Sequence, residues 1–189
     1  MDNIYSIGKV HKNTNVRRQN GGKGRRDRSV TKAIKRRPRS ENLILEKFLN
    51  EEFRKNLFDK IHEYLFDEIA KNPEEYSLIF VDKVGHISQV NAFNEHQIIE
   101  KLRNFLMQKL FEELKEQFKS PEINDREFLD KLKFVSKNLA RFVVYEVANK
   151  LRVHKTGIKE EELKKILNEV NDNIGRRPEK GVYALLFRP

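Results

Sequence analysis

Cysteine and tryptophan are absent from this chain of 189 residues, and methionine, proline and glycine are scarce. The absence of cysteine excludes a disulfide framework, a thiolate zinc site and a cysteine nucleophile. No apolar run approaches the roughly 18 residues of a membrane-spanning helix. The charged, glycine-containing N-terminus also lacks the apolar core of a signal peptide. We therefore expect a cytoplasmic protein without a membrane segment.

The positive charge of the chain is concentrated at one end. The sequence has 39 Lys and Arg against 29 Asp and Glu, and residues 1–40 contain 13 of these bases but only two acids, Asp2 and Asp27. Residues 41–189 are therefore close to neutral. The first 40 residues contain four of the eight glycines and one aromatic residue, Tyr5, too little apolar surface to offset the entropy of folding. We expect a disordered basic arm over 1–40 and a globular domain over 41–189.

The composition of this arm favours nucleic acid as a partner. Eight of its 13 bases are arginine, whose planar guanidinium binds two phosphate oxygens at once and stacks on bases. Because a glycine-rich segment holds no side chain in register, we expect sequence-independent contacts with the phosphate backbone. A solvated tail, or a localisation signal over residues 32–39, is the alternative. The predicted contact residues are Arg17, Arg18, Lys23, Arg25, Arg26, Arg28, Lys32, Lys35, Arg36, Arg37 and Arg39.

Apolar periodicity predicts four amphipathic helices in the remainder of the chain. Apolar residues recur three and four apart within residues 40–71, 94–119, 124–151 and 160–174, as on one face of an α-helix. The first stripe repeats every four residues, so it drifts around a helix of 3.6 residues per turn. That segment must bend or be covered from several sides.

Three short apolar segments predict β-structure. Residues 76–81 and 86–90 are rich in β-branched and aromatic residues and flank a turn at Gly85, as in an antiparallel hairpin. Residues 181–187 form a continuous apolar run that resembles a buried strand. Because a lone hairpin is marginally stable, we expect the three to form one small sheet. The predicted fold class is mainly α: a four-helix body with a small antiparallel β-hairpin or sheet (α+β) and a disordered basic arm.

A second basic cluster lies near the C-terminus. Arg176 and Arg177 are followed by Lys180 and Arg188. We predict Arg176 and Arg177 as further nucleic-acid contacts, with a solvated rim around the terminal strand as the alternative.

Catalytic and metal-binding motifs are incomplete in this sequence. His62-Glu63 lacks the second histidine of a zinc protease motif, and the glycines of residues 21–24 lack phosphate-loop spacing. A helix-turn-helix around Gly157 would direct the carboxylates of Glu160, Glu161 and Glu162 at phosphates, so we disfavour it. We predict no enzymatic activity, no cofactor and no metal.

The sequence thus predicts a non-enzymatic nucleic-acid-binding protein whose arm contacts phosphates and whose body acts as an anchor. The alternative is a structural subunit of a nucleoprotein assembly, capsid-like or ribonucleoprotein, whose helical body contacts other proteins or copies of itself. Phosphate contacts do not distinguish RNA from DNA, because they do not report the 2′-hydroxyl group.

Overall fold

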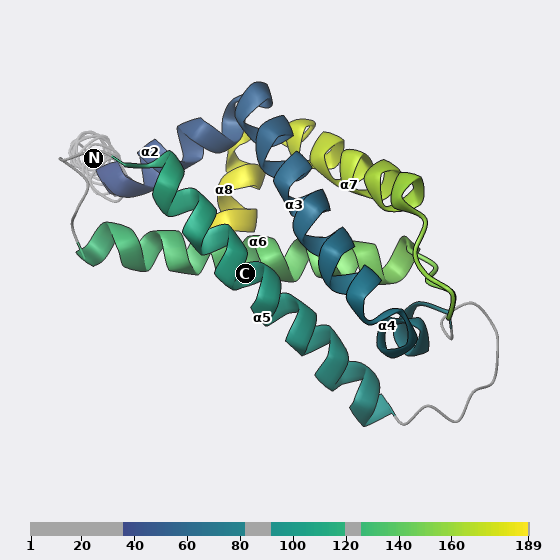
Figure 1. The fold of residues 1–189 in the computed structure, drawn as a ribbon. Coiled ribbons are helices and arrows are strands. Elements are labelled where there is room, and N and C mark those ends of the chain that lie inside the picture. Colours follow the sequence, from purple (N-terminus) through teal and green to yellow (C-terminus); the bar gives the residue numbers. More distant parts are fainter. Residues whose placement is uncertain (1–35, 82–91, 120–125, 189) are drawn as a thin grey trace, which may run out of the picture. The chain divides into compact units, whose positions relative to one another are not determined.

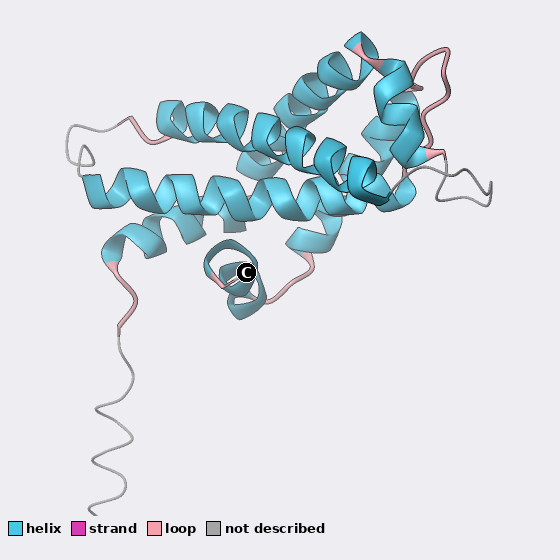
Figure 2. Ribbon diagram, turned by 90° about the horizontal axis from the view of Figure 1, so that it is seen from below, coloured by secondary structure: helices cyan, strands magenta, loops and turns pink. Residues whose placement is uncertain are grey.

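The computed structural model describes residues 36–81, 92–119 and 126–188, in which the chain forms seven helices and no strand (Figure 2). The chain divides into two units, residues 1–38 and 39–189, and all seven helices belong to the second. None of these described helices is both long and apolar enough to cross a membrane. The helices are α2 (Arg39–Leu49), α3 (Glu51–Lys71), α4 (Pro73–Phe80), α5 (Ala92–Gln117), α6 (Arg126–Lys150), α7 (Glu160–Gly175) and α8 (Glu179–Phe187).

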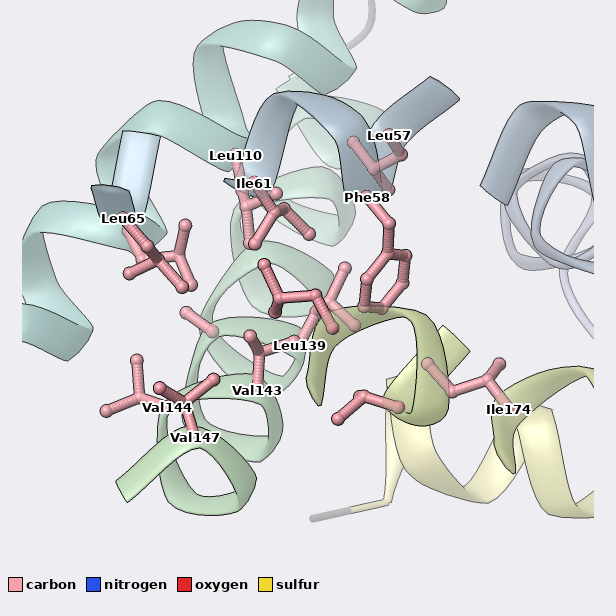
Figure 3. Packing of buried hydrophobic residues seen from close by; sticks show 14 of the residues in the cluster. Leu57, Phe58, Ile61, Leu65, Leu110, Leu139, Val143, Val144, Val147 and Ile174 are labelled. Carbon is pink, nitrogen blue, oxygen red and sulfur yellow. The ribbon is translucent and has the colours of Figure 1, made fainter. Parts of the chain in front are cut away.

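Helix α6 is the centre of the helical unit (Figure 1). Helix α5 packs along it, and α7 and α8 contact it elsewhere along its length. Helix α3 lies beside α7, while α2 contacts α3, α6 and α8. The buried residues Leu139, Val143 and Val147 recur every four residues on α6 and are 0% exposed. Figure 3 shows these side chains meeting others from α3, α5 and α7, and each such burial contributes roughly 1.5–3 kcal/mol.

The first predicted helix, residues 40–71, is divided in two. The break falls at Asn50, whose side-chain oxygen accepts a hydrogen bond of 3.0 Å from the backbone N–H of Phe53 and so caps α3. An asparagine at this position satisfies a backbone donor that the start of a helix leaves unpaired. The break redirects the chain, so that the apolar stripe on either side of Asn50 can face different neighbours.

The structure describes the first of the two strands predicted for the β-hairpin, and the prediction is wrong because this segment is helical. Residues 76–80 belong to α4, which begins at Pro73 and has Glu74 and Glu75 in its first turn. Proline and acidic residues are favourable at this end of a helix. Tyr76 and Phe80, four residues apart, are both buried on the same face. The second predicted strand, residues 86–90, lies outside the described residues.

The predicted C-terminal strand is also wrong, because residues 181–187 are part of α8. A short, wholly apolar run does not by itself distinguish a buried strand from a buried helix. In this run residues four apart lie on the same side, as in a helix. Val182 and Leu186 are both buried, and the ring centroids of Tyr183 and Phe187 lie 5.0 Å apart. The run packs against helices α2 and α6. The predicted sheet is therefore replaced by helical packing.

The other three predicted helices correspond to α5, α6 and α7, with ends that differ by a few residues. The turn before α7 is closed by backbone hydrogen bonds in both directions between His154 and Gly157. Gly157 has φ of 137°, a conformation that only glycine adopts without strain.

A buried carboxylate joins α3 to α5. The Glu113 side chain is 8% exposed and accepts hydrogen bonds from Lys60 Nζ (3.0 Å), Tyr64 OH (3.4 Å) and Gln117 Nε2 (3.1 Å). Burial of this carboxyl favours its neutral form, but the hydrogen bonds from Gln117, Lys60 and Tyr64 outweigh burial and lower the pKa of Glu113. The ionised carboxylate therefore stabilises the packing of α3 on α5.

Glu113→Gln should lower the free energy of unfolding by about 1–2 kcal/mol at pH 7, because an amide accepts these bonds less well than a carboxylate. A carboxyl whose folded-state pKa is lowered stabilises the fold above its unfolded pKa of about 4.3. That contribution is lost as pH falls through the folded-state pKa, so the gap between the variant and the wild type should narrow as the pH falls below about 4.3. Urea denaturation across pH 3–7 measures this. Glu116→Gln, at an exposed carboxylate, is the control; a gap for Glu113→Gln that persists undiminished at pH 3 contradicts the prediction.

Candidate nucleic-acid interface

An open groove of about 660 Å³ lies between α5, α6, the link from α7 to α8, and the end of α8. Cationic and aromatic side chains dominate its wall, and no aspartate or glutamate is among the described residues that line it. We refer to it as the arginine groove. Its lining residues are His96, Ile99, Arg103, Asn138, Arg141, Phe142, Tyr145, Ala148, Arg177, Leu185 and Arg188.

Four arginines converge on this groove: Arg103 from α5, Arg141 from α6, Arg177 from the α7–α8 link and Arg188 after α8. They are half of the eight arginines that follow residue 40, in a segment that is close to neutral overall. Within the described part of the chain, none of the four is in an ion pair. Clustered, unneutralised cations in a groove produce a strong local positive potential.

Aromatic rings support two of these guanidinium groups. The Arg177 guanidinium carbon lies 5.3 Å from the ring centroid of Phe142, and that of Arg188 lies 5.5 Å from the ring centroid of Tyr183. A cation–π contact of this kind restricts the side chain without using its N–H donors. Arg177 and Arg188 therefore keep their donors for an anionic ligand.

Buried polar contacts hold α8 in place at the edge of the groove. Asn138 is 5% exposed, and its Nδ2 donates a hydrogen bond of 2.7 Å to the backbone carbonyl of Leu186. Tyr183 OH of α8 donates to Glu41 Oε2 at 2.7 Å, and Lys131 Nζ donates to Glu41 Oε1 at the same distance. The hydrogen bond to Glu41 raises the pKa of Lys131 in spite of its partial burial. These contacts join α8 to α2 and α6.

Basic and aromatic side chains lie on the solvent-exposed residues of α6. Lys137 and Arg141 are exposed and lie four residues apart. The helix also carries two exposed aromatic residues, Phe134 at 40% and Tyr145 at 63%. Basic and aromatic residues together are typical of surfaces that bind single-stranded nucleic acid.

Among the predicted contact residues that the structure describes, one lines the groove. Arg177 lines it, whereas the exposed Arg176 beside it does not. Arg39 opens α2 and is not a lining residue, and Arg36 and Arg37 belong to the first unit, residues 1–38. The remaining predicted contacts lie outside the described residues: Arg17, Arg18, Lys23, Arg25, Arg26, Arg28, Lys32 and Lys35.

Sequence reasoning missed Arg103, Arg141 and Tyr145 as site residues. Arg141 and Tyr145 do leave a signal, because they lie four residues apart on α6 and interrupt its polar face with an aromatic ring. Phe142 belongs to the apolar stripe predicted within residues 124–151 but is only half-buried and contacts Arg177. Arg103 leaves no such signal, since only the packing of α5 on α6 brings it to the groove.

Other polar clusters are less suited to a ligand. The hollow beside Glu113 has a volume of about 50 Å³, little more than one or two water molecules require. His62 Nε2 is buried and has no hydrogen-bond partner among the described residues, and the His62 ring stacks on Phe66 at 5.9 Å. Among the residues with described positions, no three His, Asp or Glu side chains are grouped as metal ligands would be.

Comparison with protein-family models, with curated proteins and with solved structures gives no match for this chain.

Proposed function

We propose that this protein binds nucleic acid without catalysing a reaction, through phosphate contacts made by the basic residues 1–40 and by the arginine groove. The observation that carries the proposal is the convergence of four arginines on one groove of an otherwise near-neutral helical unit. Guanidinium groups match the geometry of phosphate oxygens and form charge-assisted hydrogen bonds with them. The high arginine content of residues 1–40 supports the same partner class independently.

Both basic regions favour contacts with the phosphate backbone over base-specific recognition. The groove takes its arginines from α5, α6, the α7–α8 link and the residue that follows α8, and contacts between such arginines and phosphates carry no sequence information. We therefore expect affinity to depend strongly on salt and weakly on sequence, because each phosphate contact releases condensed counterions.

The assembly alternative receives less support from the described surface. The exposed apolar residues Leu49, Leu78 and Phe134 belong to three different helices, α2, α4 and α6. Single exposed apolar residues are ordinary on folded proteins.

The test replaces the four groove arginines together by glutamine in the full chain. For a single-stranded RNA of 20 nucleotides, four lost phosphate contacts should reduce the slope of log K against log salt by about 3. Fluorescence anisotropy at several salt concentrations measures this slope, and circular dichroism checks the fold. The variant is Arg103→Gln, Arg141→Gln, Arg177→Gln and Arg188→Gln.

A matched control changes four exposed cations that do not line the groove: Lys55→Gln, Arg126→Gln, Lys164→Gln and Lys165→Gln. Both variants have the same net charge, so a difference between them reports the groove rather than overall electrostatics. Equal salt slopes for the two variants would remove the groove from the proposal. Tighter groove-dependent binding of an acidic peptide than of RNA would assign the groove to a protein partner.

A further inference from the structure

We propose that the arginine groove holds an unpaired nucleotide of a single strand, with its base stacked on Tyr145 and its flanking phosphates bound by the groove arginines. This inference rests on the proposed function and specifies which form of nucleic acid the groove accepts.

Tyr145 is the residue that indicates a base rather than a phosphate alone. It lines the groove and is 63% exposed, the highest value among the exposed large apolar residues of the described structure. With the described residues it forms no hydrogen bond and no ring–ring contact. An exposed tyrosine on a helix offers a rigid ring face at low entropic cost, and every base has a π-face that stacks on such a ring. Tyr145 therefore provides a stacking surface among cations.

The position of Tyr145 on its helix places the ring next to phosphate-binding groups. Arg141 precedes it by four residues, one turn earlier on the same face of α6. Arg177 lies on Phe142, the residue one turn before Tyr145 on the adjoining row. A base on Tyr145 would thus have guanidinium groups within reach of the phosphates on its own nucleotide and its neighbour.

The dimensions of the groove also suit one nucleotide. Its volume of about 660 Å³ lies within the range of roughly 300–1,000 Å³ for small-ligand sites. Within a duplex both faces of every internal base are covered by neighbouring pairs, so a tyrosine ring at the surface has no face to stack on away from the duplex ends. The groove should therefore prefer an unpaired strand, whether RNA or DNA.

The experiment compares three probes of equal length with the full chain: oligo(dT) of 12 nucleotides, a 12-mer of abasic deoxyribose phosphates, and a 12-base-pair DNA duplex. Oligo(U) serves as the RNA arm. Tyr145→Ala should weaken binding of oligo(dT) and oligo(U) by about 10-fold, the typical value of one stacked base. The same change should leave the affinities for the abasic strand and for the duplex within about 2-fold of wild type, because neither offers a free base.

Two control variants separate stacking from changes in folding. Tyr145→Phe keeps the ring and should bind oligo(dT) as the wild type does. Leu78→Ala removes an exposed apolar side chain of α4, which does not line the groove, and should also have no effect. A second measurement needs no variant: oligo(dT) containing 5-iodouracil should crosslink to Tyr145 under ultraviolet light, as mapped by mass spectrometry.

The outcomes distinguish this inference from the proposed function. If Tyr145→Ala weakens all probes equally or none, while glutamine at the four groove arginines weakens them all, the groove binds phosphates only and the stacking inference is overturned. If the arginine variant also binds like its matched control, the proposed function fails as well. A crosslink that maps only outside the groove residues would likewise overturn the inference.

Discussion

Replacing Arg17, Arg18, Arg25, Arg26 and Arg28 by glutamine in the full chain should weaken binding to duplex DNA by about four orders of magnitude at 0.1 M salt. Each arginine that neutralises one phosphate of a duplex contributes about 0.9 to the salt slope, so five contacts contribute about 4.5. At 0.1 M salt, one decade below 1 M, a slope contribution of about 4.5 corresponds to roughly four powers of ten in affinity. The five residues belong to residues 1–40, which have 13 bases against two acids.

Binding to a 20-base-pair duplex, measured at several salt concentrations, gives both the affinity and the slope. Substituting lysine at the same five positions keeps the charge and should preserve most of the slope, since counterion release depends on charge rather than on guanidinium geometry. A glutamine variant whose slope equals that of the wild type would exclude these five residues from the contact. Together with the groove variants, the comparison separates duplex contacts of the N-terminal residues from single-strand contacts of the groove.

Arg54→Ala should lower the free energy of unfolding by about 3 kcal/mol, since it removes a buried charged donor and leaves its acceptors without partners. Arg54 is 8% exposed. Its Nη1 donates to the backbone carbonyl of Phe48 at 2.8 Å, and its Nε donates to Asn171 Oδ1 at 3.3 Å. The guanidinium thus lies near the C-terminal ends of α2 and α7, where a helix dipole favours a cation. Thermal or urea denaturation measures the loss.

Gly175, the last residue of α7, provides a second variant that tests whether it is coupled to Arg54. Its backbone is not in the left-handed region, so alanine would ordinarily stabilise the helix by up to about 1 kcal/mol. Here, however, a Cβ at Gly175 would lie 2.7 Å from Arg54 Nη2. Gly175→Ala should therefore destabilise the wild type by displacing the guanidinium, yet be neutral or stabilising in the Arg54→Ala background. Equal effects of Gly175→Ala in both backgrounds would show that the two residues are not coupled.

The helical elements were predictable where long apolar stripes recur with helical spacing. The stripes of α5, α6 and α7 extend over at least four turns each, long enough for the period to be unambiguous. The two predicted strands that the structure contradicts belong to α4 and α8, helices of eight and nine residues. Over so short an apolar run, helix and strand patterns coincide, and burial against neighbouring helices selects the helix. At α4, Pro73 marks both the end of α3 and the start of the next helix.

The candidate site was predictable only in part, for a different reason. Arg177 stands out because it adjoins Arg176 in the sequence, and clusters of this kind are visible as composition. Arg103 and Arg141 are single arginines 38 positions apart, each surrounded by ordinary helical residues. The packing of α5 on α6 brings the two arginines together, and this packing cannot be predicted from composition or residue spacing.

By itself the sequence determined the charge asymmetry between residues 1–40 and the near-neutral remainder, the absence of cysteine chemistry, and the existence of the long helices. These follow from composition and from periods that are local along the chain. The tertiary structure alone decided that two short apolar runs are helices and that four distant arginines share one groove with Tyr145. Both outcomes depend on which faces meet across the core, because contacts between residues far apart in sequence form only when the helices pack.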